Sequence, residues 1–237
     1  MPIRLTGLLC GGVLLLSGGL AHAAAPFRVS VRAEAKSKTL IPERVVSLAE
    51  GPVIKDGDPS HACDGQAAIG ALQQGSGGDW TGSWSEGLGY FVTAIAGTAP
   101  RGGAYFELWI DRKLSMQGIC DAKLKSGDDV LFFVQDCEYD PKLEGCANPV
   151  TPLGVQVAKE MEKGSVRSIR VVDYAPNGKA TAEKGAKVFV NGRSIGRTDG
   201  KGRIDVKATK LGKATVHATK AGKVRSETDT FRVVKKS

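Results

Sequence analysis

The sequence holds few residues suited to acid–base or metal chemistry. Of its 237 residues, three are histidine: His22, His61 and His217. Neither His61 nor His217 stands in a nucleophile or metal-binding pattern, and the cysteines form no C-x-x-C pair. The glycine-rich stretch Gly75-Ser76-Gly77-Gly78 does not satisfy a phosphate-binding loop. We therefore predict that the protein is not an enzyme and holds neither a metal nor a cofactor.

The candidate calcium and zinc sites are incomplete in the sequence. Asp56-Gly57-Asp58 and Asp128-Asp129 carry the oxygen ligands that calcium prefers, but neither continues into a full calcium-loop pattern. His61 lies close to Cys63, as in some zinc sites, yet no matching histidine accompanies it. An enzyme is the third hypothesis. It would be favoured by an exposed cleft that brings His61 together with Asp56, Asp58 or Asp64.

A long apolar run occurs at the start of the chain. Arg4 precedes an apolar stretch over residues 5–20, and Ala21-His22-Ala23 has the small-x-small pattern of a cleavage site. A transmembrane anchor is the rival interpretation, but glycines interrupt the stretch, and a span needs about 20 apolar residues. We predict a signal peptide over residues 1–23 and hence a secreted or cell-envelope-associated, extracytoplasmic protein.

Four cysteines follow the predicted signal peptide: Cys63, Cys120, Cys137 and Cys146. Since export leads to an oxidising environment, an even number of cysteines predicts two disulfides, for which three pairings exist. The short polar loop between Cys137 and Cys146 can close on itself. This favours Cys137 with Cys146 and leaves Cys63 with Cys120, so that no thiol remains for catalysis.

The charge is divided along the chain. Residues 24–164 hold 14 Lys and Arg against 19 Asp and Glu, a net charge of −5, whereas residues 165–237 hold 18 against 6, a net charge of +12. Such a division predicts two folding units with different surfaces, joined near residue 150. We call residues 26–148 the first unit and residues 149–235 the second unit.

The first unit is predicted to be mainly β with one helix. Strands are expected from alternation or from aromatic and β-branched residues over residues 27–33, 39–48, 90–95, 105–110 and 130–134. Between the second and third of these, Asp64 can cap a short helix whose apolar residues are Ala67, Ala68, Ala71 and Leu72, with Gly75 placed to end it. Two strands, a helix and three strands predict a β-grasp-like domain.

The second unit is predicted to be all β. Short strands are expected over residues 167–174, 186–190, 203–206, 214–219 and 227–234. Turn signals such as Asn191-Gly192 and Asp199-Gly200 separate them, and these dipeptides tolerate the positive φ angles of tight hairpins. This spacing, without a helix signal, predicts a small immunoglobulin-like β-sandwich.

Residues 27–137 resemble the bacterial members of the transcobalamin C-terminal-like domain family. The resemblance rests on residues 63–68 (CDGQAA), 79–84 (DWTGSW), 87–92 (GLGYFV), 105–109 (YFELW), 118–120 (GIC) and 124–133 (LKSGDDVLFF). It departs from the family at Asp111-Arg112-Lys113, where an Asn-Gly turn is usual. The resemblance implies a β-grasp-like domain and a corrinoid among the candidate ligands, although this sequence lacks the large helical domain that completes the vitamin site.

Residues 150–234 resemble a carboxypeptidase-regulatory-like or immunoglobulin-like bacterial module. The residues that carry this resemblance are 185–192 (GAKVFVNG), 198–204 (TDGKGRI) and Arg225-Ser226. The pattern encodes turns and strands, and such modules are not peptidases. The resemblance therefore implies a fold rather than an activity.

Aromatic residues of the first unit form the candidate ligand surface. The functional interpretation is that Trp80 and Trp84, in a Gly/Ser/Asp-rich loop, are exposed and stack on a flat ligand. The alternative is that aromatic residues fill the core, and strand alternation already separates Phe106 from its neighbours in the same strand. The candidate ligand-binding residues are Trp80, Trp84, Tyr90, Tyr105 and Trp109, and the ligand is a glycan, a peptide or a corrinoid.

Basic residues of the second unit form a candidate polyanion surface. Many alternate with apolar residues, which places positive charge on the outer faces of strands. The candidates are Lys201, Arg203, Lys207, Lys210, Lys213, Lys220, Lys223 and Arg225. Anionic cell-wall polymers or a membrane surface are the expected partners. Specific nucleic-acid recognition is not expected, because no groove-reading helix or base-stacking motif accompanies the charge.

These patterns lead to one functional hypothesis and two alternatives. The first is an exported, non-enzymatic binding protein of the bacterial cell envelope, in which the first unit binds a ligand or partner and the basic second unit spaces or attaches it. The second is a structural or adhesive surface protein held to anionic cell-wall polymers. A cobalamin-type binding protein or a secreted enzyme comes third. The oligomeric state is not predicted.

Overall fold

A computed structural model describes residues 27–36, 38–136, 139–140, 142 and 145–236. The described chain is mainly β, as predicted, and contains one short α-helix, α1 (Ala68–Ser76). No helix in these ranges is long and apolar enough to cross a membrane. The predicted signal peptide, residues 1–23, lies outside the described residues.

The first unit is built on a mixed five-stranded sheet in the order β2-β1-β9-β7-β8. β1 pairs antiparallel with β2 and parallel with β9, and β9 pairs antiparallel with β7. The strands are β1 (Arg28–Ala35), β2 (Lys38–Ser47), β7 (Tyr105–Ile110), β8 (Lys113–Leu114) and β9 (Asp129–Gln135). The predicted strands in these regions are confirmed, because alternating or continuous apolar residues fix both their positions and their faces.

Smaller elements lie beside this sheet. They are β3 (Pro52–Val53), η1 (Pro59–His61), β4 (Cys63–Asp64), β5 (Trp80–Ser85), β6 (Gly89–Ile95), β10 (Tyr139–Asp140) and β11 (Gly145–Cys146). β3 pairs with β4, β5 with β6, and β10 with β11, all antiparallel. The expectation of a loop around Trp80 and Trp84 is wrong, since these residues lie in β5, which forms a hairpin with β6.

The helix differs from its prediction at both ends. It begins after Ala67, no side chain caps it, and it ends at Gly77, whose φ of 63° is left-handed. Asp64 and Gly75 therefore neither begin nor end it. Gly75 instead allows close packing, because a Cβ atom there would lie 2.6 Å from Cγ1 of Val31 in β1.

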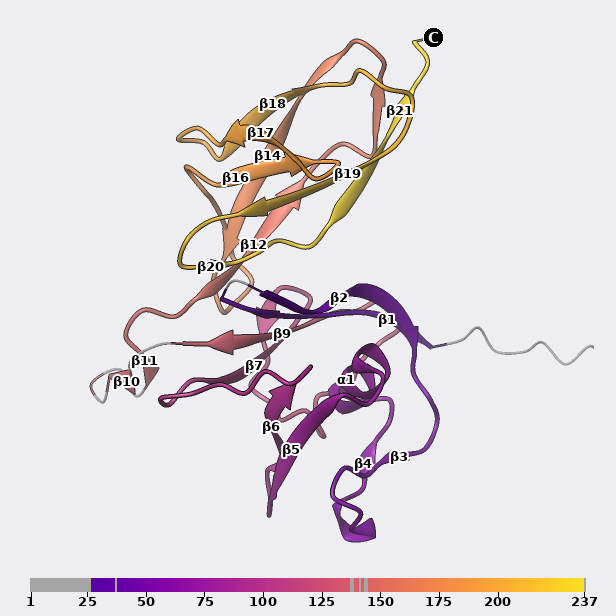
Figure 1. Cartoon of the computed structure of the whole chain (residues 1–237), viewed down its shortest axis with the longest axis vertical. Coiled ribbons are helices and arrows are strands. Elements are labelled where there is room, and N and C mark those ends of the chain that lie inside the picture. The colour runs from indigo at the N-terminus through magenta and orange to yellow at the C-terminus, as the bar shows by residue number, and fades with distance from the viewer. Residues whose placement is uncertain (1–26, 37, 137–138, 141, 143–144, 237) are drawn as a thin grey trace, which may run out of the picture.

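Both faces of the main sheet are buried. Figure 1 shows α1 against one face and the second unit on the other. On the helix side, Val31, Leu108 and Phe132 belong to the core of the first unit. On the opposite side, Trp109 and Leu131 pack with residues of the second unit. Strand alternation sends neighbouring residues to opposite faces, which explains the continuous apolar run in β9.

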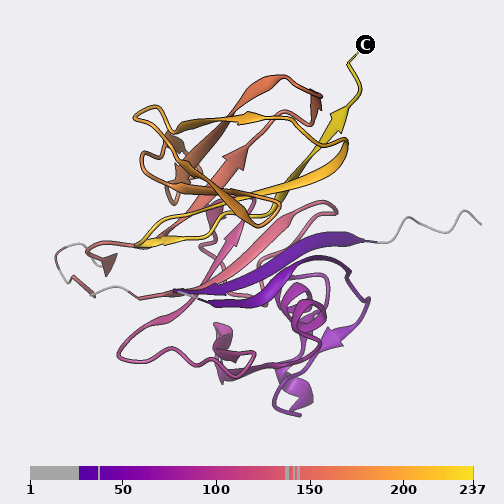
Figure 2. The same ribbon diagram turned by 45° about the horizontal axis from the view of Figure 1, so that its top comes forward.

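The second unit consists of two facing sheets (Figure 2). In one, β12 (Thr151–Gln156) and β14 (Val166–Tyr174) are joined by β15 (Ala180–Ala182), β18 (Arg203–Lys207) and β20 (Lys223–Val224). The other has the order β13-β21-β19-β16-β17, with bounds β13 (Glu160–Glu162), β16 (Lys187–Val190), β17 (Arg193–Arg197), β19 (Gly212–Thr219) and β21 (Asp229–Val234). Val171, Val188, Val216 and Phe231 pack between the sheets.

An apolar cluster and several charged groups join the two units. The cluster consists of Trp109, Leu131, Phe133, Val172, Tyr174 and Val224. Beside it, Arg225 donates to Glu34 Oε1 at 2.9 Å, and the buried Arg32 donates to the carbonyl of Arg225 at 2.9 Å. Arg112 and Glu227 form a second ion pair at 3.2 Å. The contact between the units is therefore both apolar and ionic.

Candidate functional site

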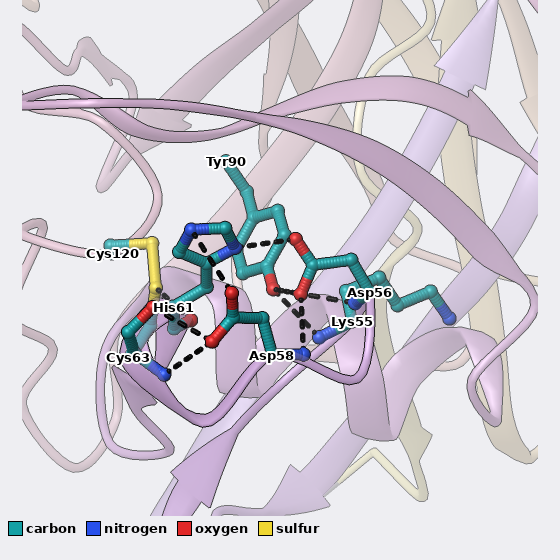
Figure 3. A network of polar contacts seen from close by, with 8 residues as sticks. Lys55, Asp56, Asp58, His61, Cys63, Tyr90 and Cys120 are labelled. Carbon is teal, nitrogen blue, oxygen red and sulfur yellow. Dashed lines mark hydrogen bonds and ion pairs between the residues drawn. A yellow bond between two sulfur atoms is a disulfide. The ribbon is translucent and has the colours of Figure 1, made fainter.

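A polar network joins residues 55–61 to the β5–β6 hairpin (Figure 3). Asp56 is its centre: the Tyr90 hydroxyl donates to Oδ1 at 2.7 Å, and His61 Nδ1 lies 2.6 Å from Oδ2. The Tyr90 hydroxyl also accepts the amide of Lys55 at 2.9 Å. The hydrogen bond from Tyr90, followed by that from His61, lowers the pKa of Asp56 to about 2. Both contacts hold this segment in one conformation.

Ring contacts and a disulfide extend this network. The His61 ring stacks on Trp84 with centroids 4.3 Å apart, and Tyr90 meets Trp84 edge-on at 5.0 Å. Cys63, two residues after His61, forms a disulfide with Cys120, which confirms that predicted pairing. The other predicted disulfide joins Cys137 with Cys146, and Cys137 lies outside the described residues.

The structure pairs His61 with Asp56, one of the contacts named above in connection with an enzyme. An Asp–His pair activates a nucleophile through the second ring nitrogen, but His61 Nε2 lies 3.9 Å from Asp58 Oδ2. Among the contacts of the described residues, no hydroxyl or thiol bonds to this nitrogen, and Ser60 Oγ donates to Asp58 instead. Nor do these residues include a group of three or more side chains positioned to hold a metal. The contacts of the polar network hold residues 55–61 in an ordered conformation.

Three of the five predicted ligand-binding aromatic residues are buried. Trp80, Tyr90 and Trp109 expose 2%, 2% and 1% of their surface. Trp80 donates its indole N–H to Gln73 Oε1 and Trp109 donates to Glu107 Oε2, both at 2.7 Å. The expectation of an exposed Trp80 is wrong, because strand alternation turns it toward the helix. Trp109 faces the second unit, so it too is unavailable to a surface ligand.

The other two predicted residues, Trp84 and Tyr105, are partly accessible, and Tyr105 opens onto a groove. The groove has a volume of about 750 Å³ and lies between β6, β7 and residues 114–121. Its buried lining includes Leu108, Ile119 and Phe132. Tyr90 also contributes to the wall, which places the polar network next to the groove.

Four large apolar or aromatic side chains of the groove lining are exposed. Leu88 is 58% exposed, Phe91 53%, Tyr105 47% and Met116 90%. The described groove lining contains no lysine, arginine or histidine, whereas Glu107 and Asp121 belong to it. A concave surface with large exposed apolar side chains is typical of a binding site. We call this feature the apolar groove.

Sequence reasoning missed three residues of the apolar groove. Leu88 was considered only as part of a family pattern. Phe91 belonged to the aromatic group of the first unit and to a predicted strand but was not among the candidate ligand-binding residues, and Met116 gave no signal. The alternation of β6 could have identified Phe91, since a strand that buries Tyr90 turns the next residue outward. Met116 follows β8 in an irregular segment, where no period predicts its direction.

The predicted basic surface is only partly free. Lys220 is paired with Glu183, Lys223 lies 2.7 Å from Asp173, and Arg225 is paired with Glu34. These three side chains differ from the expectation of outward-facing cations, because carboxylates of nearby strands hold them. The five remaining candidates are exposed, namely Lys201, Arg203, Lys207, Lys210 and Lys213.

Comparison of the chain with protein-family models and with curated protein sequences gives no match. The two family resemblances therefore stay predictions, and function has to be argued from the geometry.

Proposed function

We propose that the protein is an exported, non-enzymatic binding protein of the bacterial cell envelope. In this proposal the first unit binds a ligand in the apolar groove, and the basic second unit spaces or attaches it. The exposed apolar lining of that groove is the observation that carries the proposal. Its volume of about 750 Å³ falls within the range of about 300–1,000 Å³ that is typical of small-molecule sites.

The lining favours a ligand with an extended apolar face and no negative charge. Phe91, Tyr105 and Met116 offer apolar surface, and burial of such surface contributes about 25 cal/mol per Å². No basic side chain of the lining is available to neutralise an anion. Among the predicted ligand classes, an apolar peptide segment fits this chemistry better than an acidic glycan.

The finer fold assignment belongs to the same proposal. In the main sheet, β1 and β2 precede α1 and β7, β8 and β9 follow it, and β1 pairs in parallel with β9; this order supports a β-grasp-like first unit. Two facing sheets around a single apolar core support an immunoglobulin-like second unit. On these grounds we infer that each unit has a fold related to that of the family that it resembles.

A binding assay with a neutral apolar fluorophore, N-phenyl-1-naphthylamine, tests the proposal. The variant Phe91→Ser/Met116→Ser removes two exposed walls of the groove, so we expect at least about 10-fold weaker binding, equivalent to about 1.4 kcal/mol. Val45→Ser is the matched control, because Val45 is 67% exposed on β2, outside the groove. Peptides, glycans and a corrinoid are then tested for their ability to displace the bound fluorophore from the groove.

Two results would contradict this function. Equal loss of fluorophore binding in Val45→Ser and in the groove variant would mean that the fluorophore binds exposed apolar surface non-specifically. Complete absence of binding to the wild-type protein would remove the groove as a site. The adhesive alternative would then become the leading hypothesis, since it depends on the second unit alone.

A further inference from the structure

One sheet of the second unit sets two pairs of positive side chains directly opposite one another, and the described part of the other sheet has one such pair, Arg170 with Arg203. In the sheet β13-β21-β19-β16-β17, Lys187 is the cross-strand partner of Arg197, and Lys213 is the partner of Arg232. Directly opposed residues share one face, with Cβ atoms about 5 Å apart. Val188, the neighbour of Lys187, and Ala214, the neighbour of Lys213, are both buried in the core, so both pairs lie on the outer face. We call this surface the like-charge face.

The positive charges of this face are not neutralised within the described part of the chain. None of its four basic residues takes part in a salt bridge there. Arg197 donates to the carbonyl of Gly185 at 2.8 Å, and Lys187 Nζ lies 5.1 Å from the Phe189 ring centroid. Neither contact removes a charge. Glu160 is the cross-strand neighbour of Arg232 in β13, which leaves a net positive face.

Like charges directly opposite one another destabilise a sheet. The two pairs therefore lower the stability of the second unit, unlike the interface cations, which have carboxylate partners. An external anion placed between the members of a pair would remove this repulsion and gain two charge-assisted contacts. The arrangement thus favours an anionic partner more strongly than the same charges dispersed over the surface.

The separation of the pairs indicates the shape of the partner. Lys187 lies opposite Thr219, and Lys213 comes six residues earlier in the same strand. At about 3.3 Å per residue the pairs are about 20 Å apart along the strand. Thr215 and His217 lie between them, and burial, followed by the charge of Arg225, lowers the pKa of His217. A small anion reaches one pair, whereas a linear polymer reaches both.

The side chains between the pairs indicate the class of polymer. The rings of Phe189 and His217 stack on each other at 4.8 Å and 4°, so each covers a face that nucleic-acid binding would use for base stacking. Thr215 and Thr219 present hydroxyl groups, which suit a hydroxyl-rich polymer better than the apolar interior of a bilayer. These features favour a polysaccharide.

We propose that the like-charge face binds a linear anionic polysaccharide, with one basic pair at each end of the contact. This inference rests on the attaching role proposed for the second unit and names its partner class. It is independent of the apolar groove. A groove variant that loses its ligand should therefore still bind the polysaccharide.

Binding of the full exported chain to dextran sulfate at low ionic strength tests this inference, with uncharged dextran as the matched polymer. We expect binding to dextran sulfate alone, weakened by added salt through screening. Lys187→Gln/Arg197→Gln and Lys213→Gln/Arg232→Gln should each bind at least about 10-fold more weakly. Both variants should unfold at the same or a higher temperature than the wild type, because a repulsion is removed.

The control variant Arg167→Gln/Lys179→Gln removes the same charge from β14 and from the turn between β14 and β15, in the other sheet of the sandwich. Less than about 3-fold weakening is expected for it, since these residues lie outside the like-charge face. Equal weakening by control and pair variants would overturn the proposal in favour of net charge alone. Tighter binding to phosphatidylglycerol vesicles or to a single-stranded oligonucleotide would overturn it in favour of a membrane or a nucleic acid. The groove variant Phe91→Ser/Met116→Ser, measured in parallel, separates failure here from failure of groove binding.

Discussion

Substitution Glu34→Gln tests how the two units are held together. Glu34 lies in β1 with 4% of its side chain exposed, between Arg225 at 2.9 Å and Arg32 at 3.7 Å. Arg32 is itself 3% exposed. The substitution preserves shape but leaves a buried guanidinium without its carboxylate. Removing one partner of a buried pair costs about 3–5 kcal/mol, a large part of the 5–15 kcal/mol that stabilises a typical domain.

Urea unfolding followed by two probes measures this effect. The three tryptophans, Trp80, Trp84 and Trp109, all lie in the first unit, and Trp109 packs against the second unit. Fluorescence therefore reports the first unit and its contact with the second, while far-ultraviolet circular dichroism reports both units as a whole. We expect the two signals to coincide in the wild type. In Glu34→Gln the midpoint should fall and the signals should separate, because the ionic contact between the units is weakened.

The exposed ion pair of Lys123 with Asp64 supplies the control. Its side chains are 65% and 43% exposed, and exposed pairs contribute about 0–1 kcal/mol. Lys123→Gln should therefore unfold almost as the wild type does. If Glu34→Gln loses no more than Lys123→Gln, or if its two signals still coincide, the buried charges do not couple the units and the reasoning fails.

Two further substitutions test the polar network and the packing at the interface. Tyr90→Phe should raise the pKa of Asp56 from about 2 toward its ordinary value. Since the pKa of Asp56 is lower in the folded than in the unfolded protein, its ionised carboxylate stabilises the fold above about pH 3.9, and this contribution is lost as the pH falls toward 2. A carbon-13 titration that gives the same Asp56 pKa in Tyr90→Phe and in the wild type would contradict this. Gly154→Ala should cost about 1–3 kcal/mol in thermal unfolding, because its Cβ would lie 2.3 Å from the Tyr174 ring. Gly200→Ala, with no atom nearby, is its control, and equal stability of the two would refute the packing argument.

Strand positions could be predicted from the sequence because burial repeats with a period of two. The run Val130–Val134 held a further signal, since a strand that is apolar at successive positions is covered on both faces. In the structure Phe132 faces α1 and Phe133 faces the second unit. The helix ends could not be placed, because its N-terminus has no capping side chain and Gly77 rather than Gly75 adopts the left-handed conformation.

The candidate site was only partly predictable. Tyr105 was among the candidate ligand-binding residues, but aromatic character does not distinguish it from the buried Trp109, which lies four residues away on the same strand face. Leu88 and Met116 join the apolar groove from separate segments, so the tertiary structure alone brings them together. The disulfide was easier to predict, since export and an even number of cysteines limited the pairings to three.

The division of charge can now be separated into two parts. At the contact between the units, Arg32, Arg112 and Arg225 face Glu34, Glu43 and Glu227, so the charges there nearly cancel. Attraction between an acidic and a basic unit therefore does not account for the excess of +12 in residues 165–237. That excess lies on solvent-facing strands, in part as opposed pairs that weaken the sheet. A surface that costs stability without an internal partner is explained most directly by an external polyanion.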